Sequence, residues 1–293
     1  MIILKKCPIC SGKKLTKKLS CKDFTFSMEK FTIVSCETCD FTFTNPRPDD
    51  DSLQHYYKSE SYISHTNSTK GLFNLIYQKI RSYTIKRKVV LLKKLGCKGK
   101  HLDIGCGTGE FLHACASSGL KCMGIEPSKL ARTQAIKNYN LSVSSDTNLG
   151  NIAECSFDSI TMWHVLEHLP DVVNTVSGLQ KILKKKGKVI IGVPNHKCLD
   201  AKIYKEYWAA WDVPIHLWHF SQHTIETLFK KNNFKLIQKK PMIFDSFYVS
   251  LLSEQFKTGK KNYLRSLAVG FISNIYATLS KKGHSSIIYI FEK

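Results

Sequence analysis

The chain has 293 residues, of which 43% are hydrophobic and 23% are charged. This composition excludes a disordered, collagen-like or low-complexity chain, and the length allows a principal domain with a small appendage. The formal net charge is +21, yet only five of the 44 basic residues are arginine. A lysine-rich surface favours anionic partners in general but argues against a specific reader of nucleic-acid bases, which depends on arginine.

The sequence contains no run of 18 apolar residues, so we expect no membrane span. Lys5 and Lys6 lie where a secretory signal needs its apolar stretch. The eleven cysteines are spread along the chain rather than packed into a short scaffold. We therefore expect a reducing, cytoplasmic location.

Two CxxC motifs open the chain, Cys7-Pro8-Ile9-Cys10 and Cys36-Glu37-Thr38-Cys39, with 25 residues between them. Each motif presents two thiolates from one tight turn, and two facing turns supply a tetrahedral sulfur site. Two redox motifs, or an accident of a cysteine-rich chain, are the alternatives; a redox CxxC begins a helix after a strand. We predict a zinc ribbon over residues 1–48, with structural Zn²⁺ held by Cys7, Cys10, Cys36 and Cys39.

Residues 49–98 read as a polar connector followed by a helix. Apolar side chains recur there at helical spacing, and Gly96 and Gly99 mark the end of the helix. The repeating positions are Leu72, Leu75, Ile76, Lys79, Ile80 and Tyr83, continued by Val89, Val90, Leu92 and Leu95. The principal domain is expected over residues 99–293.

Strand and helix patterns alternate from His101 onward, which indicates an α/β fold with a parallel sheet covered on both faces. The strand candidates are His101–Ile104, Cys122–Ile125, Leu141–Ser144, Ser159–Trp163, Val189–Val193, Phe234–Ile237 and Ile287–Phe291. The sixth and seventh are about fifty residues apart. An apolar stripe lies between them, formed by Leu264, Leu267, Ala268, Phe271, Ile275 and Leu279.

We expect this stripe to belong to a helical lid that packs on its own sheet. Lys260, Lys261, Arg265 and the pair Lys281-Lys282 surround it, which is the form of a basic amphipathic helix. Docking on an anionic membrane is therefore the alternative, possible but not favoured.

Asp103-Ile104-Gly105-Cys106-Gly107-Thr108-Gly109 runs from a strand through a glycine-rich turn into a helix. Alternate glycines let the backbone approach a ligand closely, and the helix start offers free N–H groups. Glu126 follows the second strand, 21 residues after Gly105, where a carboxylate accepts hydrogen bonds from ribose hydroxyls. A dinucleotide fold is the alternative, but it requires GxGxxG.

These motifs resemble class I S-adenosylmethionine-dependent methyltransferases. Residues 103–109 are similar to their first motif, Glu126 to their ribose-binding acid, Phe157–Leu169 to their fourth strand and Gly187–Asn195 to their fifth. The resemblance implies a Rossmann-like seven-stranded sheet with an antiparallel last strand. It also implies S-adenosylmethionine as cofactor, with contacts expected from Asp103, Gly105, Cys106, Gly107, Gly109, Glu126, Pro127, Asp146, Trp163 and His164. Asp146, with Thr147, is our expectation for the adenine end.

Two histidine-rich segments follow the fourth and fifth strands, Trp163–His168 and Pro214–Ser221. Methyl transfer generally needs a group that removes a proton, and histidine serves this near neutral pH. An arbitrary histidine is more often a core or capping residue, but His168 and His216 are expected at the carboxyl edge of the sheet. Glu167 lies beside His168 and is a third candidate.

The chain also resembles nucleotide-sugar C-methyltransferases, through its ribbon, Phe41–Pro48, the aromatics Tyr56, Tyr57 and Tyr62, and a His-Leu-x-x-Phe-Ser run at His216. This resemblance implies a general base at His216 and an assisting histidine at His168. The chain has Pro214-Ile215-His216 where that family carries His-Glu-His. Methyltransferases of polysaccharide and secondary-metabolite pathways share the shorter motif.

Three tryptophans, Trp208, Trp211 and Trp218, gather beside Tyr204 and Tyr207. They form either an aromatic wall for a substrate ring or the ordinary packing of a lid.

The sequence therefore predicts a methyltransferase (EC 2.1.1.-) acting on a small metabolite or glycan precursor, anionic and either nucleotide-sugar-like or lipid-linked. An RNA methyltransferase that holds the phosphate backbone through the ribbon and lysines is the alternative, although no specific nucleic acid is expected. A cofactor-binding partner protein without chemistry is the third possibility; the intact motif residues argue against it.

Overall fold

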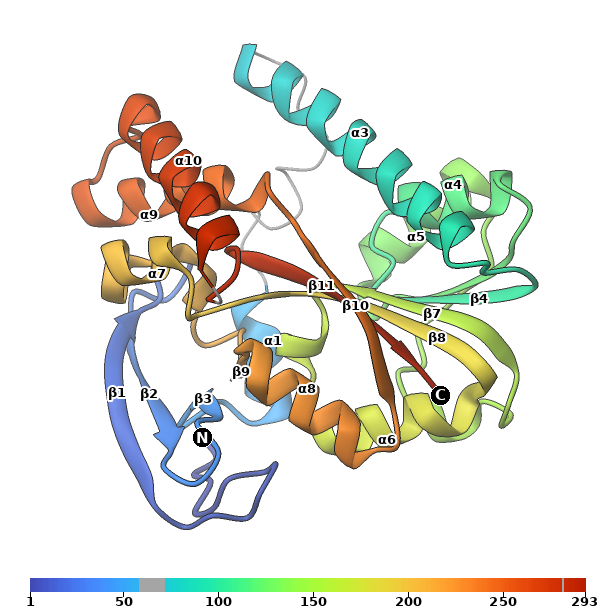
Figure 1. Ribbon diagram of the computed structural model, residues 1–293, viewed down its shortest axis with the longest axis horizontal. Coiled ribbons are helices and arrows are strands. Elements are labelled where there is room, and N and C mark those ends of the chain that lie inside the picture. The colour runs from blue at the N-terminus through green and yellow to red at the C-terminus, as the bar shows by residue number, and fades with distance from the viewer. Residues whose placement is uncertain (58–71, 281) are drawn as a thin grey trace.

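A seven-stranded mixed sheet forms the centre of the protein, seen here in a computed structural model that describes residues 1–57, 72–280 and 282–293 (Figure 1). Its strands are β4 (Lys100–Ile104), β5 (Lys121–Ile125), β6 (Val143–Ser144), β7 (Phe157–Trp163), β8 (Leu183–Pro194), β10 (Lys235–Pro241) and β11 (Ser286–Glu292). They lie in the order β10-β11-β8-β7-β4-β5-β6. β11 runs antiparallel to both neighbours, whereas β4 to β8 pair in parallel. The predicted seven-stranded α/β fold is thus confirmed, including its antiparallel last strand.

Both faces of the sheet are covered because buried strands carry apolar side chains on either side. In β8, Ile190 packs against α3 (Leu72–Lys94) and α4 (Glu110–Ser117) on one face. Its neighbours Val189 and Ile191 join the larger core on the other face. α6 (Val172–Ile182) and α8 (Gln222–Lys231) lie on that second face, and α5 (Lys129–Tyr139) lies near α4 (Figure 1).

The predicted helix of the connector is present as α3, but its apolar face is buried only in the second half. Val89 and Leu92 are buried against the sheet, whereas Leu75, Ile76 and Tyr83 are exposed. The first half of α3 extends beyond the sheet (Figure 1). A short helix, α1 (Asp50–Tyr56), precedes it; Tyr62 lies outside the described residues.

The N-terminal region forms a second sheet with strands β1 (Leu15–Lys22), β2 (Lys30–Cys36) and β3 (Thr42–Thr44). A fourth strand, β9 (Trp218–His219), comes from the principal part of the chain and pairs antiparallel with β3. Phe43 lies opposite Trp218 in this pairing, and the rings of Phe41 and Trp218 stack 5.9 Å apart. The residues directly after His216 are thus built into the N-terminal sheet.

Two helices are inserted between β10 and β11, as predicted: α9 (Asp245–Thr258) and α10 (Tyr263–Leu279). They pack beside α7 (Leu199–Tyr204) and the 3-10 turns η3 (Lys205–Tyr207) and η4 (Ala209–Trp211). The prediction that the apolar stripe of this insertion packs on the sheet is wrong. α10 buries small residues against α9, and the large apolar side chains of the stripe are exposed. Lys281 lies outside the described residues.

None of the helices in the described ranges is long and apolar enough to cross a membrane.

Candidate active site

The glycine loop joins β4 to α4 at the carboxyl edge of the sheet. Gly105, Gly107 and Gly109 all have positive φ angles, 72°, 55° and 89°, which favour glycine. A Cβ at Gly105 would collide with Val165, and one at Gly109 would lie 2.8 Å from Ala135 Cβ. Gly107 instead faces open space, with nothing within 4 Å of a Cβ there. The first and third glycines therefore permit packing, and the second leaves room for a ligand.

Glu126 is held against this loop. One carboxylate oxygen accepts a hydrogen bond of 2.9 Å from the Gly107 N–H, and the other accepts one of 2.8 Å from the Ser128 N–H. Arg132 donates to the carbonyls of Glu126 and Pro127, at 2.7 and 3.1 Å. The carboxylate is thus fixed at the end of β5, and each oxygen keeps a lone pair for a further donor.

A buried hydrogen-bond chain lies beneath the loop, across β4 and β7. Thr161 donates to Asp103 at 2.6 Å and also contacts His101 at 3.1 Å. Ser159 contacts the other ring nitrogen of His101 at 2.9 Å. Burial lowers the pKa of His101 to about 4, so the ring is neutral. Burial also raises the pKa of Asp103 to about 7, against the lowering effects of Thr161 and Lys88.

The raised pKa of Asp103 predicts a pH-dependent stability. A carboxyl group whose folded pKa exceeds its unfolded value stabilises the fold below pH 4 and loses that contribution as the pH rises through about 7. Relative to Asp103→Asn, the wild type should therefore lose at least about 1.4 kcal/mol of unfolding free energy between pH 4 and 8, the equivalent of one pKa unit. Urea unfolding of the cofactor-free protein measures this; a difference that stays constant with pH would contradict it.

Lys88, on α3, was missed by the sequence analysis. Its ammonium lies 4.0 Å from the centroid of the Trp163 ring, and burial lowers its pKa to about 8. The Trp163 indole nitrogen is buried and has no hydrogen-bond partner in the described part of the chain. Cys106, in contrast, directs its sulfur toward Gly124, within the packing behind the loop.

Asp146 is exposed after β6, and both of its oxygens serve a local turn. They accept hydrogen bonds from the Asn148 N–H at 2.8 Å and the Asn151 side chain at 2.7 Å. A contact between Asp146 and adenine stays a prediction.

The two predicted histidines meet at the carboxyl edge. The rings of His168, in the 3-10 turn η2 (Leu166–His168), and His216 are 4.5 Å apart and nearly perpendicular. His216 Nδ1 donates to the Ala210 carbonyl at 2.9 Å, so in the neutral ring Nε2 carries the lone pair. His168 Nδ1 donates to the Ile215 carbonyl at 3.1 Å and lies equally close to the Tyr57 hydroxyl. Burial lowers the pKa of His168 to about 3, which keeps its ring neutral.

Glu167 is 1% exposed and lies between this pair and His164. His164 contacts Glu167 at 3.4 Å and Asp245, the first residue of α9, at 3.1 Å. Burial alone would lower the pKa of His164, but the two carboxylates raise it to about 10, so it is positively charged at neutral pH. This links the inserted helices to the site.

The same cluster meets a simple requirement for metal binding. A carboxylate oxygen of Glu167 and one ring nitrogen each of His168 and His216 lie within 4.8 Å of one another. The cluster can therefore either transfer a proton or bind a metal ion. The two functions predict different responses to mutation and to added divalent metal.

The four cysteines of the N-terminal motifs also come together. Their sulfurs all lie within 4.8 Å of one another, with Cys7–Cys39 at 3.6 Å and Cys10–Cys36 at 3.5 Å. Gly12 is needed beside them because a Cβ there would lie 2.7 Å from Thr38 and 3.1 Å from the Cys36 sulfur. Four such sulfurs are a suitable donor set for tetrahedral Zn²⁺.

Trp208, Trp211 and Trp218 are buried, and each indole N–H has a partner. Trp208 donates to Asp200, Trp211 to the Lys205 carbonyl and Trp218 to the Leu169 carbonyl. All three rings are thus packed in the core, and Trp208 and Trp211 also line part of the hollow described next.

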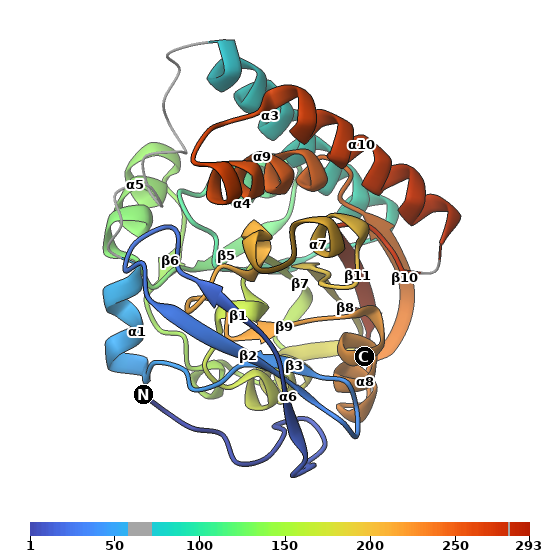
Figure 2. The ribbon, with the colours of Figure 1, turned by 90° about the vertical axis from the view of Figure 1, so that its left-hand side faces the viewer.

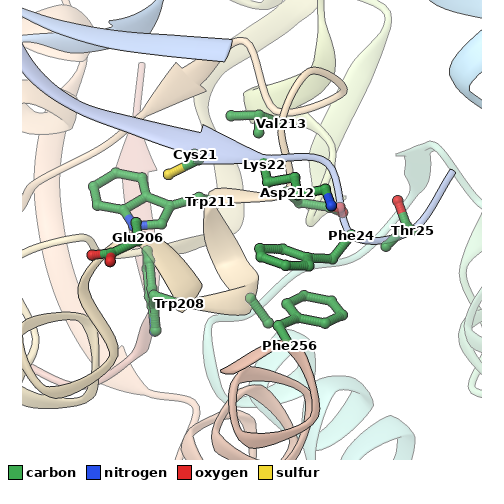
Figure 3. A pocket seen from close by; sticks show the side chains of 11 residues that line it. Cys21, Lys22, Phe24, Thr25, Glu206, Trp208, Trp211, Asp212, Val213 and Phe256 are labelled. Carbon is green, nitrogen blue, oxygen red and sulfur yellow. The ribbon is translucent and has the colours of Figure 1, made fainter. Parts of the chain in front are cut away.

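A small hollow lies between the end of β1 and the turns η3 and η4 (Figure 3), with an accessible volume of about 10 Å³, which is room for about one water molecule. Phe24 and Phe256 stack on its wall with ring centroids 4.9 Å apart. Asp212 also lines it, and the Asp212 carboxylate lies 3.8 Å from His216 Nε2. The hollow thus reaches a residue that contacts the candidate base.

Comparison with known proteins identifies the family of the chain. A family model described as "Methyltransferase domain" matches residues 77–239. Two curated relatives are ubiquinone biosynthesis O-methyltransferases. The one from Haemophilus ducreyi is 32% identical over 33% of this chain and 45% of its own, and the one from Vibrio cholerae is 29% identical over 47% and 58%. The chain thus spans about half the length of these relatives.

Among solved structures, the magnesium protoporphyrin IX methyltransferase from Synechocystis PCC 6803 is similar. It is 13% identical, covers 84% of this chain and 100% of its own, and has a TM-score of 0.57. At this identity the similarity shows the fold alone.

Proposed function

Since the chain belongs to the class I S-adenosylmethionine-dependent methyltransferases, we propose that it transfers the cofactor's methyl group to a small anionic acceptor. When bound, the cofactor supplies an electrophilic methyl carbon that a nucleophile of the acceptor displaces in line. The proposal rests on one juxtaposition: the Glu126–Gly107 contact and the His168–His216 pair share the carboxyl edge of one sheet. This is where open α/β sheets bind their ligands.

The residues at the glycine loop fit this cofactor. Glu126 would accept hydrogen bonds from the ribose hydroxyls, and the open approach at Gly107 leaves room for the cofactor beside the loop. Gly105, Gly109 and Pro127 shape the same turn. Asp103 and Cys106 support it from behind, Asp146 would meet the adenine, and Trp163 and His164 would line the far side.

The acceptor is proposed to be a small metabolite or a glycan precursor, nucleotide-sugar-like or lipid-linked. The names of the O-methyltransferase relatives support an oxygen nucleophile. The excess of lysine favours an anionic group on the acceptor.

His216 is proposed to remove the acceptor's proton through Nε2, since its Nδ1 is already committed to a backbone carbonyl. His168, held neutral and in contact with His216, would orient the acceptor or share that task. Glu167 is proposed to stabilise His216 once it has taken the proton, because it is buried beside both rings.

We also propose that Cys7, Cys10, Cys36 and Cys39 hold a structural Zn²⁺ in the N-terminal region. Four sulfurs close the coordination shell, so this metal has no open position for catalysis. The division into residues 1–48, 49–98 and 99–293 and the cytoplasmic location remain predictions.

The proposal is tested by incubating the full chain with methyl-labelled cofactor and fractionated metabolites or total RNA. We expect label to appear in anionic small molecules and not in RNA. His216→Asn serves as the inactive control. Label recovered in RNA, with a strong dependence on salt, would favour the RNA alternative instead.

Replacing Glu126 by alanine should weaken cofactor binding about ten- to a hundredfold. Loss of a charged hydrogen-bond acceptor costs about 1.5–3 kcal/mol, which corresponds to that change in affinity. Titration calorimetry measures it. Glu154→Ala, at an exposed acid, is the matched control; equal affinities in the two variants would reject the placement of Glu126.

A further inference from the structure

The helix α10 presents its large apolar side chains to solvent and its small side chains to the protein. Its buried residues are Ser266, Val269, Gly270, Ser273 and Ala277. Leu264 and Leu279 are each 83% exposed and Phe271 is 60% exposed. Leu267, Ile272 and Ile275 are exposed beside them. We call these six exposed side chains the outer stripe of α10.

This orientation is fixed by packing on the inner side of the helix. A Cβ at Gly270 would lie 2.7 Å from the Phe247 ring of α9, so only glycine permits this close approach. Ser273 donates a hydrogen bond of 2.6 Å to Asp200, which is fully buried. Rotating the outer stripe inward would leave that carboxylate without one of its donors and would force large side chains against α9.

An outer stripe of this kind is unusual for a free surface. It extends over 16 residues, from Leu264 to Leu279, or about 22 Å at the helical rise. Contiguous exposed apolar patches on folded proteins generally mark an interaction site. Figure 2 shows α10 on the outside of the inserted pair of helices. No other element in the described ranges covers the stripe, since all six side chains are exposed.

The charged residues around the stripe indicate the chemistry of its binding partner. Residues 257–282 contain no Asp or Glu. Lys257, Lys260 and Lys261 are exposed before the helix, and Lys282 is exposed after it. Arg265 pairs with Glu254 at 3.0 Å and is already neutralised. A second copy of this chain would bring the same cations against one another, whereas a surface of anionic lipid headgroups complements them.

We propose that the outer stripe of α10 docks the protein on an anionic membrane surface. The apolar side chains enter the boundary between headgroups and acyl chains, and the flanking lysines contact the headgroups. Neither the insertion of the apolar side chains nor the lysine contacts suffices alone for stable binding, so both are required.

Docking there connects the membrane to the active site through two packed helices, α10 and α9. α9 packs against α10 and begins at Asp245, which pairs with His164. Tyr248 of α9 also contacts Tyr77 of α3, with ring centroids 6.0 Å apart. Of the acceptor classes proposed above, this arrangement favours the lipid-linked one. That consequence rests on the proposed function, whereas docking itself does not.

The test is flotation of the full chain with vesicles of phosphatidylcholine, with or without phosphatidylglycerol. We expect co-flotation with the anionic vesicles at low salt, weaker binding at high salt and none with the neutral vesicles. The combined Leu264→Ser, Phe271→Ser and Leu279→Ser variant should lose at least about tenfold in bound fraction. These side chains are exposed, so an unchanged melting temperature confirms that the variant folds.

The contribution of charge is tested separately. Lys257→Gln, Lys260→Gln and Lys261→Gln together should also reduce binding at least about tenfold. The matched control removes three exposed lysines elsewhere, at Lys93, Lys94 and Lys98, and should keep most of the binding.

Two results would overturn the proposal. The first is absence of co-flotation at low salt. The second is a dimer in light scattering that the apolar triple variant converts to monomer, which would make the stripe a contact between copies. Methyl transfer to a water-soluble acceptor by the apolar variant would show that the proposed function stands independently of docking.

Discussion

Replacing His216 by asparagine should lower turnover by about 10²–10⁴-fold and leave cofactor affinity nearly unchanged. The asparagine amide can still donate to the Ala210 carbonyl, so it keeps the contact that holds this segment. It lacks Nε2, the nitrogen proposed to take the proton. Steady-state kinetics and calorimetry separate the two effects, and exposed His223→Asn is the control.

The pH profile of turnover distinguishes a base from a structural residue. A general base produces an acidic limb because it is inactive once protonated, so that limb should disappear in His216→Asn. Retention of most of the turnover with the same limb would make His216 structural. If the cluster instead holds a metal ion, Glu167→Gln should lose as much turnover as His216→Asn, and activity should depend on added divalent metal.

The central sheet could be predicted from the sequence because its strands are short apolar runs between glycine-marked turns. The antiparallel direction of the last strand came from the resemblance, not from periodicity. The predicted strand boundaries were less accurate where a strand contains a run of charged residues. β8 begins at Leu183, six residues before the predicted Val189, because the charged run Lys184–Lys186 lacks the apolar pattern of a buried strand.

The orientation of α10 could not be predicted in the same way. Periodicity identifies the residues that share one face of a helix, but it does not say whether that face points inward. The decisive contacts are Gly270 against Phe247 and Ser273 with Asp200, which join residues far apart in the sequence. Small polar side chains at these positions look like a solvated face.

The sequence led to the right region for the site, since His168 and His216 lie in contact and Glu126 lies against Gly107. Their roles remain predictions. Lys88 and Asp245 were missed because nothing in the sequence marks them. Lysine is common within exposed helices such as α3, and aspartate is common at the start of a helix, as in α9. Only the tertiary structure brings them to Trp163 and His164.

The N-terminal sheet affects the site through backbone pairing. Thr44 of β3 donates from its N–H to the Leu217 carbonyl at 3.0 Å and from its hydroxyl to the His216 carbonyl at 2.9 Å. The Leu217 N–H donates to the Glu167 carbonyl at 2.8 Å. The cysteine cluster therefore supports a sheet that positions two of the proposed catalytic residues.

Replacing Cys36 by serine should accordingly remove the metal and lower turnover. Structural Zn²⁺ supplies about 10–16 kcal/mol of apparent binding free energy to small zinc domains, so losing one of its four ligands should lower the melting temperature clearly. Turnover should fall as well, because β2 ends at Cys36 and pairs with β3, which holds the His216 carbonyl. Elemental analysis should find one zinc per chain in the wild type and in the exposed-cysteine control Cys155→Ser, and far less in Cys36→Ser. Freshly purified wild-type protein without zinc would refute the metal assignment, whereas a zinc-free variant with full turnover would refute only the link from the cysteine cluster to His216.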